Sequence, residues 1–369
     1  MNTKQLQFLA DIQTGPFGSQ LHKEDYVEIG TPIVTVEHLG NRIFTEQNLP
    51  RVSDDDKARL EKYVLQHGDI VFSRVGSVDR CSFVDEEHDG WLFSGRCLRV
   101  RPNEQIDAMY LYYYFCMEET KQFVRNIAVG ATMPSINTKL MGEVPITYPS
   151  LIEQKRTAKI LAAIDDRIEN NTKINDNLQQ QAQAIYASMF IDNADPAWEQ
   201  GHLSDLIAVK YGKDHKKLAD GSYPVYGSGG IMRHVERPLY DKESVLIPRK
   251  GTLNNVMYVN QPFWSVDTMF YTEMRLPNVA KFVYHFVKAK DLASMNAGSA
   301  VPSMTTDILN AIEVAIPSAS ALEEFEALVS PMYKAMQEND NQSEILAKLR
   351  DALLPKLMSG EIDVSDIQL

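Results

Sequence analysis

The sequence has few of the features that mark secreted, membrane or metal-binding proteins. It contains only three cysteines in 369 residues, and Cys81, Cys97 and Cys116 form no CxxC pair. Reduced, mostly buried thiols are therefore expected rather than disulfides or a zinc site. No apolar run approaches the roughly 18 residues of a membrane span, and the N-terminus lacks the basic-then-apolar layout of a signal peptide. We therefore expect a cytoplasmic protein.

The motifs of common catalytic sites are also missing. There is no phosphate-cradling GxxxxGK[ST], no HExxH metal motif and no evident Ser/His/Asp arrangement. The glycine-rich GSGG at 227–230 is followed by Ile-Met-Arg-His rather than by a helix start, so it indicates a turn that another backbone can approach closely. We therefore expect a binding or scaffolding chain that is not an enzyme, with no metal and no cofactor of its own.

An excess of basic charge is absent as well. The net charge is −13, which taken alone argues against a nucleic-acid partner. The acidic residues are unevenly distributed, however, because residues 196–318 hold 13 basic and 12 acidic side chains while 319–369 hold 4 and 10. A net total of this kind does not exclude a local basic face.

The chain does contain an internal repeat. GATMPSINTKLMGEVPITYPS at 130–150 is followed 168 residues later by GSAVPSMTTDILNAIEVAIPS at 298–318, with no gap. The identical positions are Gly130/Gly298, Pro134/Pro302, Ser135/Ser303, Thr138/Thr306, Pro149/Pro317 and Ser150/Ser318. Upstream, GDIVFSRVG at 68–76 resembles ESVLIPRKG at 243–251. The similar segments keep the same order and differ in loop length, which indicates a duplicated domain.

Two long stretches are predicted to be helical. Residues 151–190 contain no glycine or proline, and their apolar residues recur three and four apart, as in a coiled-coil seam. Such a helix needs a partner, and 319–358 offers a matching pattern for antiparallel pairing. We expect the seam to break at 170–171, where two asparagines stand, and Pro331 and Pro355 to kink the second helix or mark its breaks. The predicted seam residues are Leu161, Ile164, Ile168, Leu178, Ile185, Leu346, Leu349, Leu353 and Leu357.

The remaining segments indicate mixed, strand-rich structure. Strands are predicted at 31–39, 68–75, 80–85, 91–101, 223–227, 244–248, 255–260 and 264–274, and helices near 53–63, 107–124 and 278–295. Ser53 is expected to cap the first of these helices. The fold class is thus α+β. We expect pseudo-repeated domains at 1–150 and 196–318, separated by two long antiparallel coiled-coil helices at 151–195 and 319–369.

Several motifs in this order resemble the specificity subunit of a type I restriction–modification enzyme. They are GPFGSQLHKEDYVEIGTPI (15–33), GDIVFSRVGS (68–77), MPSINTKLMGEVPI (133–146), EQKRTAKILAAIDDRIE (153–169), YPVYGSGG (223–230) and LLPKLMSGEI (353–362). The resemblance implies two target-recognition domains that each read one half of a bipartite double-stranded DNA target. It implies that the helices set the spacer and dock two methyltransferase subunits.

The resemblance also implies where the chemistry of the complex lies. S-adenosylmethionine would be bound by the methyltransferase partner, which usually modifies adenine. ATP and magnesium would be bound by a restriction or translocase subunit, where one joins the complex in phage defence. Two other interpretations stay open: an enzyme with its own methyltransferase or nuclease centre, and a pseudo-symmetric scaffold or stand-alone regulatory protein of a DNA-modification or phage-defence system.

Candidate DNA contacts follow from side-chain chemistry, because the motifs themselves do not identify base-reading residues. Loops with Arg, Lys, Asn, Ser or Thr, and turns that a DNA backbone can approach, suit base and phosphate contacts. The candidates are Ser73, Arg74, Ser77, Lys210, Lys213, Lys216, Lys217, Tyr226, Ser228, Arg249, Lys250, Thr252, Asn254 and Asn255. For the aligned pair Arg74 and Arg249, the rival interpretation is a structural arginine paired with an acid in each domain.

Overall fold

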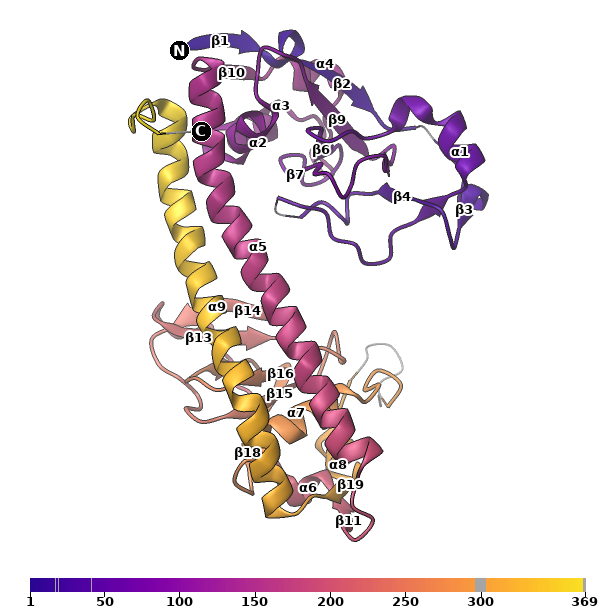
Figure 1. Ribbon diagram of the computed structural model, residues 1–369, viewed down its shortest axis with the longest axis vertical. Helices are drawn as coiled ribbons and strands as arrows, with labels where there is room; N and C mark the ends of the chain where they lie inside the picture. The colour runs from indigo at the N-terminus through magenta and orange to yellow at the C-terminus, as the bar shows by residue number, and fades with distance from the viewer. Residues whose placement is uncertain (17, 19, 41, 296–302, 368–369) are drawn as a thin grey trace. The chain divides into compact units, whose positions relative to one another are not determined.

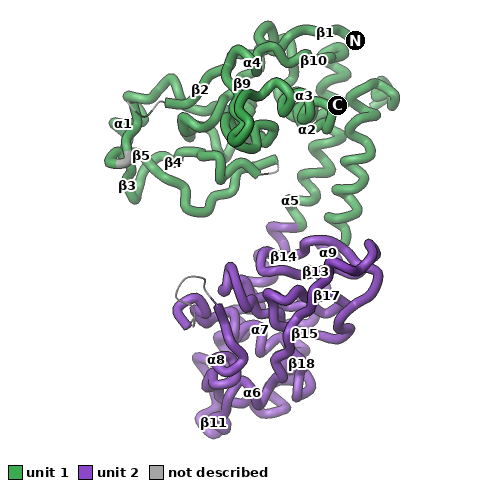
Figure 2. Tube along the Cα trace, turned by 180° about the vertical axis from the view of Figure 1, so that it is seen from behind, with its two compact units in different colours: residues 1–171, 341–369 green, residues 172–340 purple. Residues whose placement is uncertain are grey.

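The computed structural model describes residues 1–16, 18, 20–40, 42–295 and 303–367, and the chain divides into two compact units (Figures 1 and 2). Unit 1 comprises Met1–Asn171 and Asn341–Leu369, and unit 2 comprises Thr172–Asp340. Gly298 and Pro302, two identical positions of the repeat, lie outside the described residues. Both units mix strands with helices, so the α+β class is confirmed. Within the described residues, we find no helix long and apolar enough to cross a bilayer.

Unit 1 is built around an antiparallel sheet with the strand order β2-β9-β6-β7 among the described residues. These strands are β2 (Ala10–Thr14), β9 (Cys97–Pro102), β6 (Ile70–Ser73) and β7 (Cys81–Phe83). A second sheet has the order β3-β5-β4-β8, formed by β3 (Tyr26–Val27), β5 (Arg51–Val52), β4 (Thr31–Val34) and β8 (Leu92–Phe93). β4 and β8 run parallel. Finally, β1 (Asn2–Gln5) pairs with β10 (Pro145–Tyr148).

The helices of unit 1 follow local capping signals. Ser53 caps α1 (Asp54–Arg59), because its hydroxyl accepts a hydrogen bond of 3.1 Å from the Asp56 N–H, as predicted. The single helix expected at 107–124 is two helices, α2 (Ala108–Cys116) and α3 (Glu118–Ile127). The break falls at Met117, whose backbone is extended (φ −63°, ψ 136°). The short α4 (Thr138–Gly142) lies in the repeated segment.

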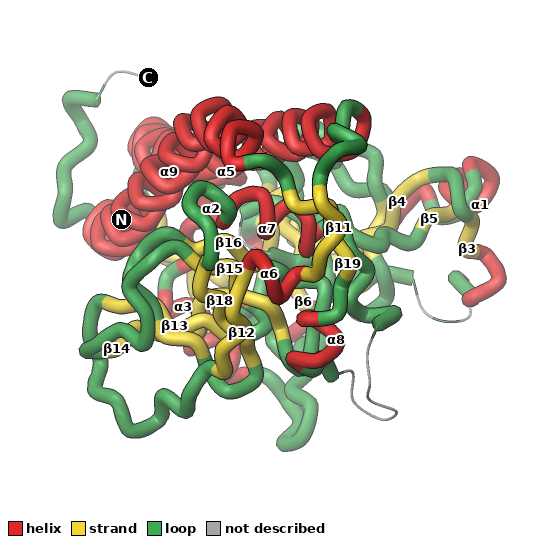
Figure 3. Tube along the Cα trace, turned by 90° about the horizontal axis from the view of Figure 1, so that it is seen from below, coloured by secondary structure: helices red, strands yellow, loops and turns green. Residues whose placement is uncertain are grey.

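Unit 2 repeats this connectivity. Its main sheet has the order β12-β18-β15-β16 and a smaller one β14-β13-β17 (Figure 3). The strands are β12 (Ile207–Tyr211), β18 (Met269–Met274), β15 (Ser244–Pro248), β16 (Met257–Val259), β14 (Gly230–Val235), β13 (Tyr223–Gly227) and β17 (Trp264–Ser265), and β11 (Glu199–His202) pairs with β19 (Glu313–Ile316). β13 and β17 are parallel, as β4 and β8 are in unit 1. The shared strand order supports the duplication inferred from the sequence.

Of the short helices of unit 2, only the one at 278–295 was predicted. These short helices are α6 (Leu203–Leu206), α7 (Ala280–Lys288) and α8 (Thr306–Asn310). α7 is shorter than the predicted helix at 278–295. α8 and α4 occupy equivalent places in the repeat, and each is capped by a side chain: Asn137 accepts from the Leu140 N–H and Thr305 from the Ile308 N–H.

Two long helices contribute to both units. α5 (Leu151–Ala187) continues into a short π-helix (Ser188–Asp192), and α9 (Ala319–Ser359) is the last helix of the chain. In each unit α5 and α9 lie side by side and antiparallel (Figures 1 and 2). Of the predicted seam, Leu161 and Leu357 are buried. The partly buried members are Ile164, Ile168, Leu178, Ile185, Leu346 and Leu353.

Leu349 does not belong to the seam, because its side chain is 46% exposed. The buried face of α9 is centred on Leu354, together with Leu357 and Met358. At about 100° per residue, Leu349 lies about 140° around the helix from Leu354. The three-and-four spacing of leucines therefore placed this residue on the wrong face.

Neither α5 nor α9 is broken at the positions that the sequence singled out, whereas a slip of the seam at 170–171 and a kink at either proline stay predictions. α5 is continuous through Asn171, which is 1% exposed and donates hydrogen bonds to Gln342 (3.0 Å) and Ser343 (3.1 Å) of α9. Polar residues inside a helix pair fix its register without ending the helices. α9 likewise runs through Pro331 and Pro355. Both prolines are exposed, and a proline removes only one intrahelical hydrogen bond, so packing of the neighbouring apolar residues maintains the helix.

A buried polar contact anchors the helices in each unit, and its chemistry differs between the two. In unit 1, the Asp165 carboxylate accepts from the Arg350 guanidinium at 2.7 Å and from the Tyr113 hydroxyl at 2.7 Å. Burial would lower the pKa of Arg350, but the hydrogen bonds and charges of Asp165 and Asp351 together outweigh it and raise that pKa. In unit 2, His285 bonds to Gln183 (2.7 Å) and to the Tyr333 hydroxyl (2.9 Å). The first anchor is ionic and the second is neutral.

The neutral anchor predicts a pH dependence of stability. Burial, assisted by the charge of Lys288, lowers the pKa of His285 from 6.5 to about 4. This pKa is lower in the folded than in the unfolded state. The contribution of His285 to the free energy of unfolding is therefore fully present above about pH 6.5 and is lost as the pH falls towards 4. We expect the free energy of unfolding to drop by about 2 kcal/mol between pH 7 and pH 5 from this group.

Urea unfolding of the full chain at both pH values measures this difference. His285→Gln keeps hydrogen-bonding capacity without titrating, so it should reduce the pH-dependent loss, whereas His234→Gln, at an exposed histidine of the same unit, should not. Equal losses in the wild-type and His285→Gln chains would contradict the neutral anchor.

Candidate nucleic-acid interface

In unit 2, the loop that follows β15 is fixed at Arg249. The Arg249 guanidinium donates to the Asp267 carbonyl at 3.1 Å and lies over the Tyr211 ring at 5.4 Å. The Arg249 carbonyl in turn accepts from the Met304 N–H at 2.9 Å, in the repeated segment. These contacts join the ends of β12 and β15, the turn before β18 and the segment before α8. The arginine thus holds several backbone segments in one place.

Gly212 allows a second close backbone approach, next to the segments that Arg249 holds. Gly212 follows β12, and its N–H donates to the Met269 carbonyl at 3.0 Å. A β-carbon added to Gly212 would lie 2.0 Å from the Val266 carbonyl oxygen, so only glycine fits this backbone approach. The next residue, Lys213, donates its N–H to the Ser265 carbonyl at 2.8 Å. The lysine-containing loop that begins here is therefore fixed at its base.

The β13–β14 hairpin reaches the same loop. The Asn255 side-chain amide donates to the Ser228 carbonyl at the hairpin turn, at 2.8 Å. Gly251, with φ of 87°, also approaches this turn, because a β-carbon there would lie 2.8 Å from the Ser228 hydroxyl oxygen. Asn254 donates to Asp291 and accepts from the Ala293 N–H. Asn254 and Asn255 thus hold the loop in place, a role that chemistry at the sequence level did not reveal.

Unit 1 contains the same assembly. The Arg74 guanidinium donates to the Gly95 carbonyl at 3.2 Å, and the Arg74 carbonyl accepts from the Ile136 N–H at 3.0 Å. Gly15 follows β2, and a β-carbon there would lie 2.1 Å from the Ser94 carbonyl oxygen. Gly76 has φ of 75°, matching Gly251. Two arginines and two glycines therefore make equivalent contacts in the two copies.

These contacts revise the two interpretations of Arg74 and Arg249. Each guanidinium donates to a backbone carbonyl of the turn that precedes β9 or β18, which is a structural role. Both arginines position loops that carry other exposed side chains. Whether either also touches DNA stays a prediction.

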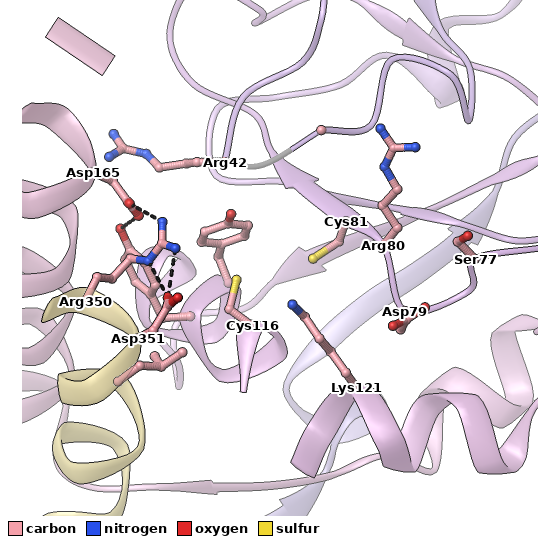
Figure 4. A pocket seen from close by; sticks show the side chains of 14 residues that line it. Arg42, Ser77, Asp79, Arg80, Cys81, Cys116, Lys121, Asp165, Arg350 and Asp351 are labelled. Atoms are coloured by element: carbon pink, nitrogen blue, oxygen red, sulfur yellow. Dashed lines mark hydrogen bonds and ion pairs between the residues drawn. The ribbon is translucent and has the colours of Figure 1, made fainter. Parts of the chain in front are cut away.

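Ser73 must be removed from the candidate contacts. Its side chain is 2% exposed, and its hydroxyl donates to the Val75 carbonyl at 2.6 Å. Ser73 is the last residue of β6, whose side chains are all buried. The adjacent loop residue Ser77 is exposed and lines a polar cavity of about 370 Å³ in unit 1, beside Asp79 and Arg80 (Figure 4).

The remaining candidates differ in surroundings. Lys210 lies within β12, 3.4 Å from Glu273 of β18, so its ammonium already has an acidic neighbour. Tyr226 is partly buried and its hydroxyl accepts from Gln261 at 3.4 Å. The exposed candidates on the unit 2 loops are Lys213, Lys216, Lys217, Lys250 and Thr252. These exposed side chains, with the partly buried Ser228, form the surface that the loop assembly presents.

Sequence reasoning missed several members of this assembly. Gly15 begins one of the motifs of the family resemblance, but the role of Gly15 and Gly212 depends on a carbonyl from a distant segment, so the sequence does not reveal it. Tyr211, Ile231 and Met232 are 52%, 55% and 61% exposed. Apolar residues in strands are usually assigned to a core, and only the structure shows these three at the surface.

Among the described residues, no group of His, Cys, Asp and Glu side chains is placed to hold a metal ion. Cys81, Cys97 and Cys116 are free thiols, the first two buried. Cys81 and Cys116 line the unit 1 cavity together with Lys121 (Figure 4).

A duplicated α+β domain, an equivalent loop assembly in each copy and a long helix after each copy together define a two-domain binding protein. The family described as the type I restriction modification DNA specificity domain matches residues 1–180 and 196–353. The chain belongs to this family.

Individual relatives agree with this assignment. The chain is 25% identical over 311 residues to the type I restriction enzyme MjaIX specificity subunit of Methanocaldococcus jannaschii, covering 73% of this chain and 72% of that protein. It is 21% identical to the HindI specificity subunit of Haemophilus influenzae, covering 82% and 88% of the two chains. A crystal structure of a type I system S subunit from M. genitalium has the same fold, with a TM-score of 0.61, 19% identity and coverage of 96% and 95%.

Proposed function

We propose that this chain is the DNA-recognition subunit of a type I restriction–modification complex, in which each unit reads one half of a bipartite double-stranded target. One observation carries the proposal: Arg74 and Arg249 build the same loop assembly in both units. The proposal agrees with the names of the relatives, which are specificity subunits of type I restriction enzymes.

The loop assembly suits sequence reading because its framework and its exposed residues are separate. The framework is made by backbone contacts at equivalent glycines and arginines. The side chains at aligned positions of the loops differ between the units, as the partly buried Val75 in unit 1 and the exposed Lys250 in unit 2 illustrate. Rigid loops with exchangeable side chains can present different hydrogen-bonding groups to base edges, while lysines contact phosphates.

In the proposed complex, partner subunits carry out catalysis. In it, two methyltransferase subunits bind S-adenosylmethionine and dock on α5 and α9, which also set the spacer between the half-sites. A restriction or translocase subunit with ATP and magnesium can join, and this chain itself is not catalytic. Residues 319–369, which comprise α9 and the segment after it, hold 10 acidic and 4 basic side chains, and this acidic excess favours a basic docking partner.

Genome-wide mapping of methylated bases tests the proposal. The chain and its methyltransferase partner are expressed together in a host without adenine methylation. We expect one bipartite motif with a fixed gap and a modified adenine in each half. A continuous motif, or methylation that does not depend on this chain, would refute the two-reader function. Binding of S-adenosylmethionine to the isolated chain in calorimetry would instead favour an enzyme.

A further inference from the structure

The tip of the β13–β14 hairpin exposes an apolar pair. Ile231 is 55% and Met232 is 61% exposed, just after the turn at Ser228 and Gly229. A β-carbon added at Gly229 or Gly230 would meet no atom within 4 Å, so the turn itself is open to its surroundings. In unit 1, the strand in the equivalent place, β4, pairs with β5 rather than with a hairpin partner. The exposed pair therefore belongs to a feature that distinguishes unit 2.

The hairpin tip is held firmly despite its exposure. Asn255 donates to the Ser228 carbonyl, and the Val266 N–H donates to the Tyr226 carbonyl at 3.1 Å, so both the turn and β13 are tied to neighbouring segments. β13 also pairs with β17 at Tyr226 and Ser265. An exposed apolar pair on a fixed ribbon needs no ordering before it contacts a partner, which lowers the entropic cost of binding.

Lysines lie on the segments next to this ribbon. The loop that carries Lys213, Lys216 and Lys217 is joined to β14, because the Arg233 guanidinium donates to the Leu218 carbonyl at 2.8 Å and the Glu236 N–H to the Ala219 carbonyl at 3.0 Å. The loop that carries Lys250 is joined to the turn through Gly251 and Asn255. All four lysines are exposed. Two segments that carry exposed lysines are thus joined to the hairpin, one along β14 and the other at its turn.

This combination favours DNA over a protein surface as the partner. The major groove, about 12 Å wide, admits a two-stranded β-ribbon and presents thymine methyl groups and base edges between two rows of phosphates. The groove therefore offers apolar contacts between two rows of negative charge. These features complement the apolar tip and the lysines on the segments next to it. Phosphate neutralisation by lysines would supply affinity, and the tip would supply sequence dependence.

We propose that the β13–β14 tip enters the major groove of the half-site read by unit 2, where Ile231 and Met232 contact base edges and the four lysines contact the flanking phosphates. The inference rests on the proposed function and identifies the residues through which unit 2 performs it.

Binding of the complex of this chain with its methyltransferase subunits, measured by fluorescence anisotropy, tests the inference. The probes are a duplex with the mapped site and one with a scrambled second half-site. For the double variant Ile231→Ala/Met232→Ala, we expect about ten-fold weaker binding to the cognate duplex, little change on the scrambled one, and an unaltered salt dependence. Lys216→Ala/Lys217→Ala should weaken binding to both duplexes and reduce the slope of log Kd against log salt by about 1 per lost contact.

Matched measurements separate the possible outcomes. Leu276→Ala removes a leucine of unit 2 that is 36% exposed and lies outside both the hairpin and the two long helices, so it should leave both affinities unchanged. If the wild-type complex prefers the cognate duplex and the tip variant binds like wild type, or weakens on both duplexes equally, the tip inference is overturned and the proposed function stands. A wild-type complex without any preference for the cognate duplex would instead overturn the proposed function, and the inference with it.

Discussion

Exchange of residues 1–150 for the corresponding segment of another specificity subunit should change one half of the recognised sequence and leave the other half intact. The contacts that fix the unit 1 loops all fall inside this segment, at Gly15, Arg74, Gly95 and Ile136. The exchanged loops should therefore keep the contacts that hold them in place. Loss of a half-site usually costs a specific DNA-binding protein 10³-fold or more in discrimination, so the change in motif should be complete.

Mapping of methylated bases in cells that carry the hybrid chain measures the new motif. The donor segment should keep a tyrosine at Tyr113, because its hydroxyl bonds to Asp165, which lies outside the exchanged segment. The reciprocal exchange of 196–318 should change the other half. If one exchange altered both halves, the units would not be independent readers.

Asp165→Ala should be the most destabilising single substitution at the helix anchors. The carboxylate is 5% exposed, pairs with Arg350 and accepts from Tyr113, so its removal leaves a cation and a hydroxyl without their shared partner. Breaking a buried ion pair by deleting one member costs about 3–5 kcal/mol, and the retained contact of Arg350 with Asp351 places the expected loss near the lower value. Urea unfolding of the full chain measures it.

The neighbouring residue provides a matched control. Asp166 pairs with Arg42 at 2.6 Å, but its side chain is 53% exposed, so Asp166→Ala should cost less than about 1 kcal/mol. Asp165→Ala/Arg350→Met should recover part of the loss, because no cation is then left unpaired. Equal effects of Asp165→Ala and Asp166→Ala would show that the anchor is not buried in solution.

The architecture could be predicted from the sequence because it depends on patterns that recur. The repeat predicted a duplicated domain, and strands predicted at 223–227 and 244–248 are β13 and β15 with the same bounds. A helix break at the prolines of α9 did not occur, since an intrinsic penalty at Pro331 is outweighed by packing that the sequence does not display, while a kink there stays a prediction.

The candidate interface was less predictable, because its framework is made by long-range backbone contacts. Arg74 and Arg249 were selected from their aligned positions, but their bonds to Gly95 and Asp267 join segments about 20 residues apart. The glycine-rich turn of the hairpin was singled out in the sequence, but its apolar pair was not, since the sequence does not distinguish exposed from buried apolar residues. Only the tertiary structure shows that Ile231 and Met232 face outward.

The contrast between the ionic and the neutral anchor restricts which helices can form a pair. Ala182 holds in α5 the place that Arg350 holds in α9, since the two lie 168 residues apart, the offset of the repeat. If two copies of α5 paired with each other, Asp165 would face Ala182, and its buried carboxylate would lack a cation at a cost on the order of 3 kcal/mol. The two long helices are therefore not interchangeable at this anchor. Pairing of α5 with α9 is more stable than pairing of α5 with a second α5, which disfavours association between the first halves of two nascent chains.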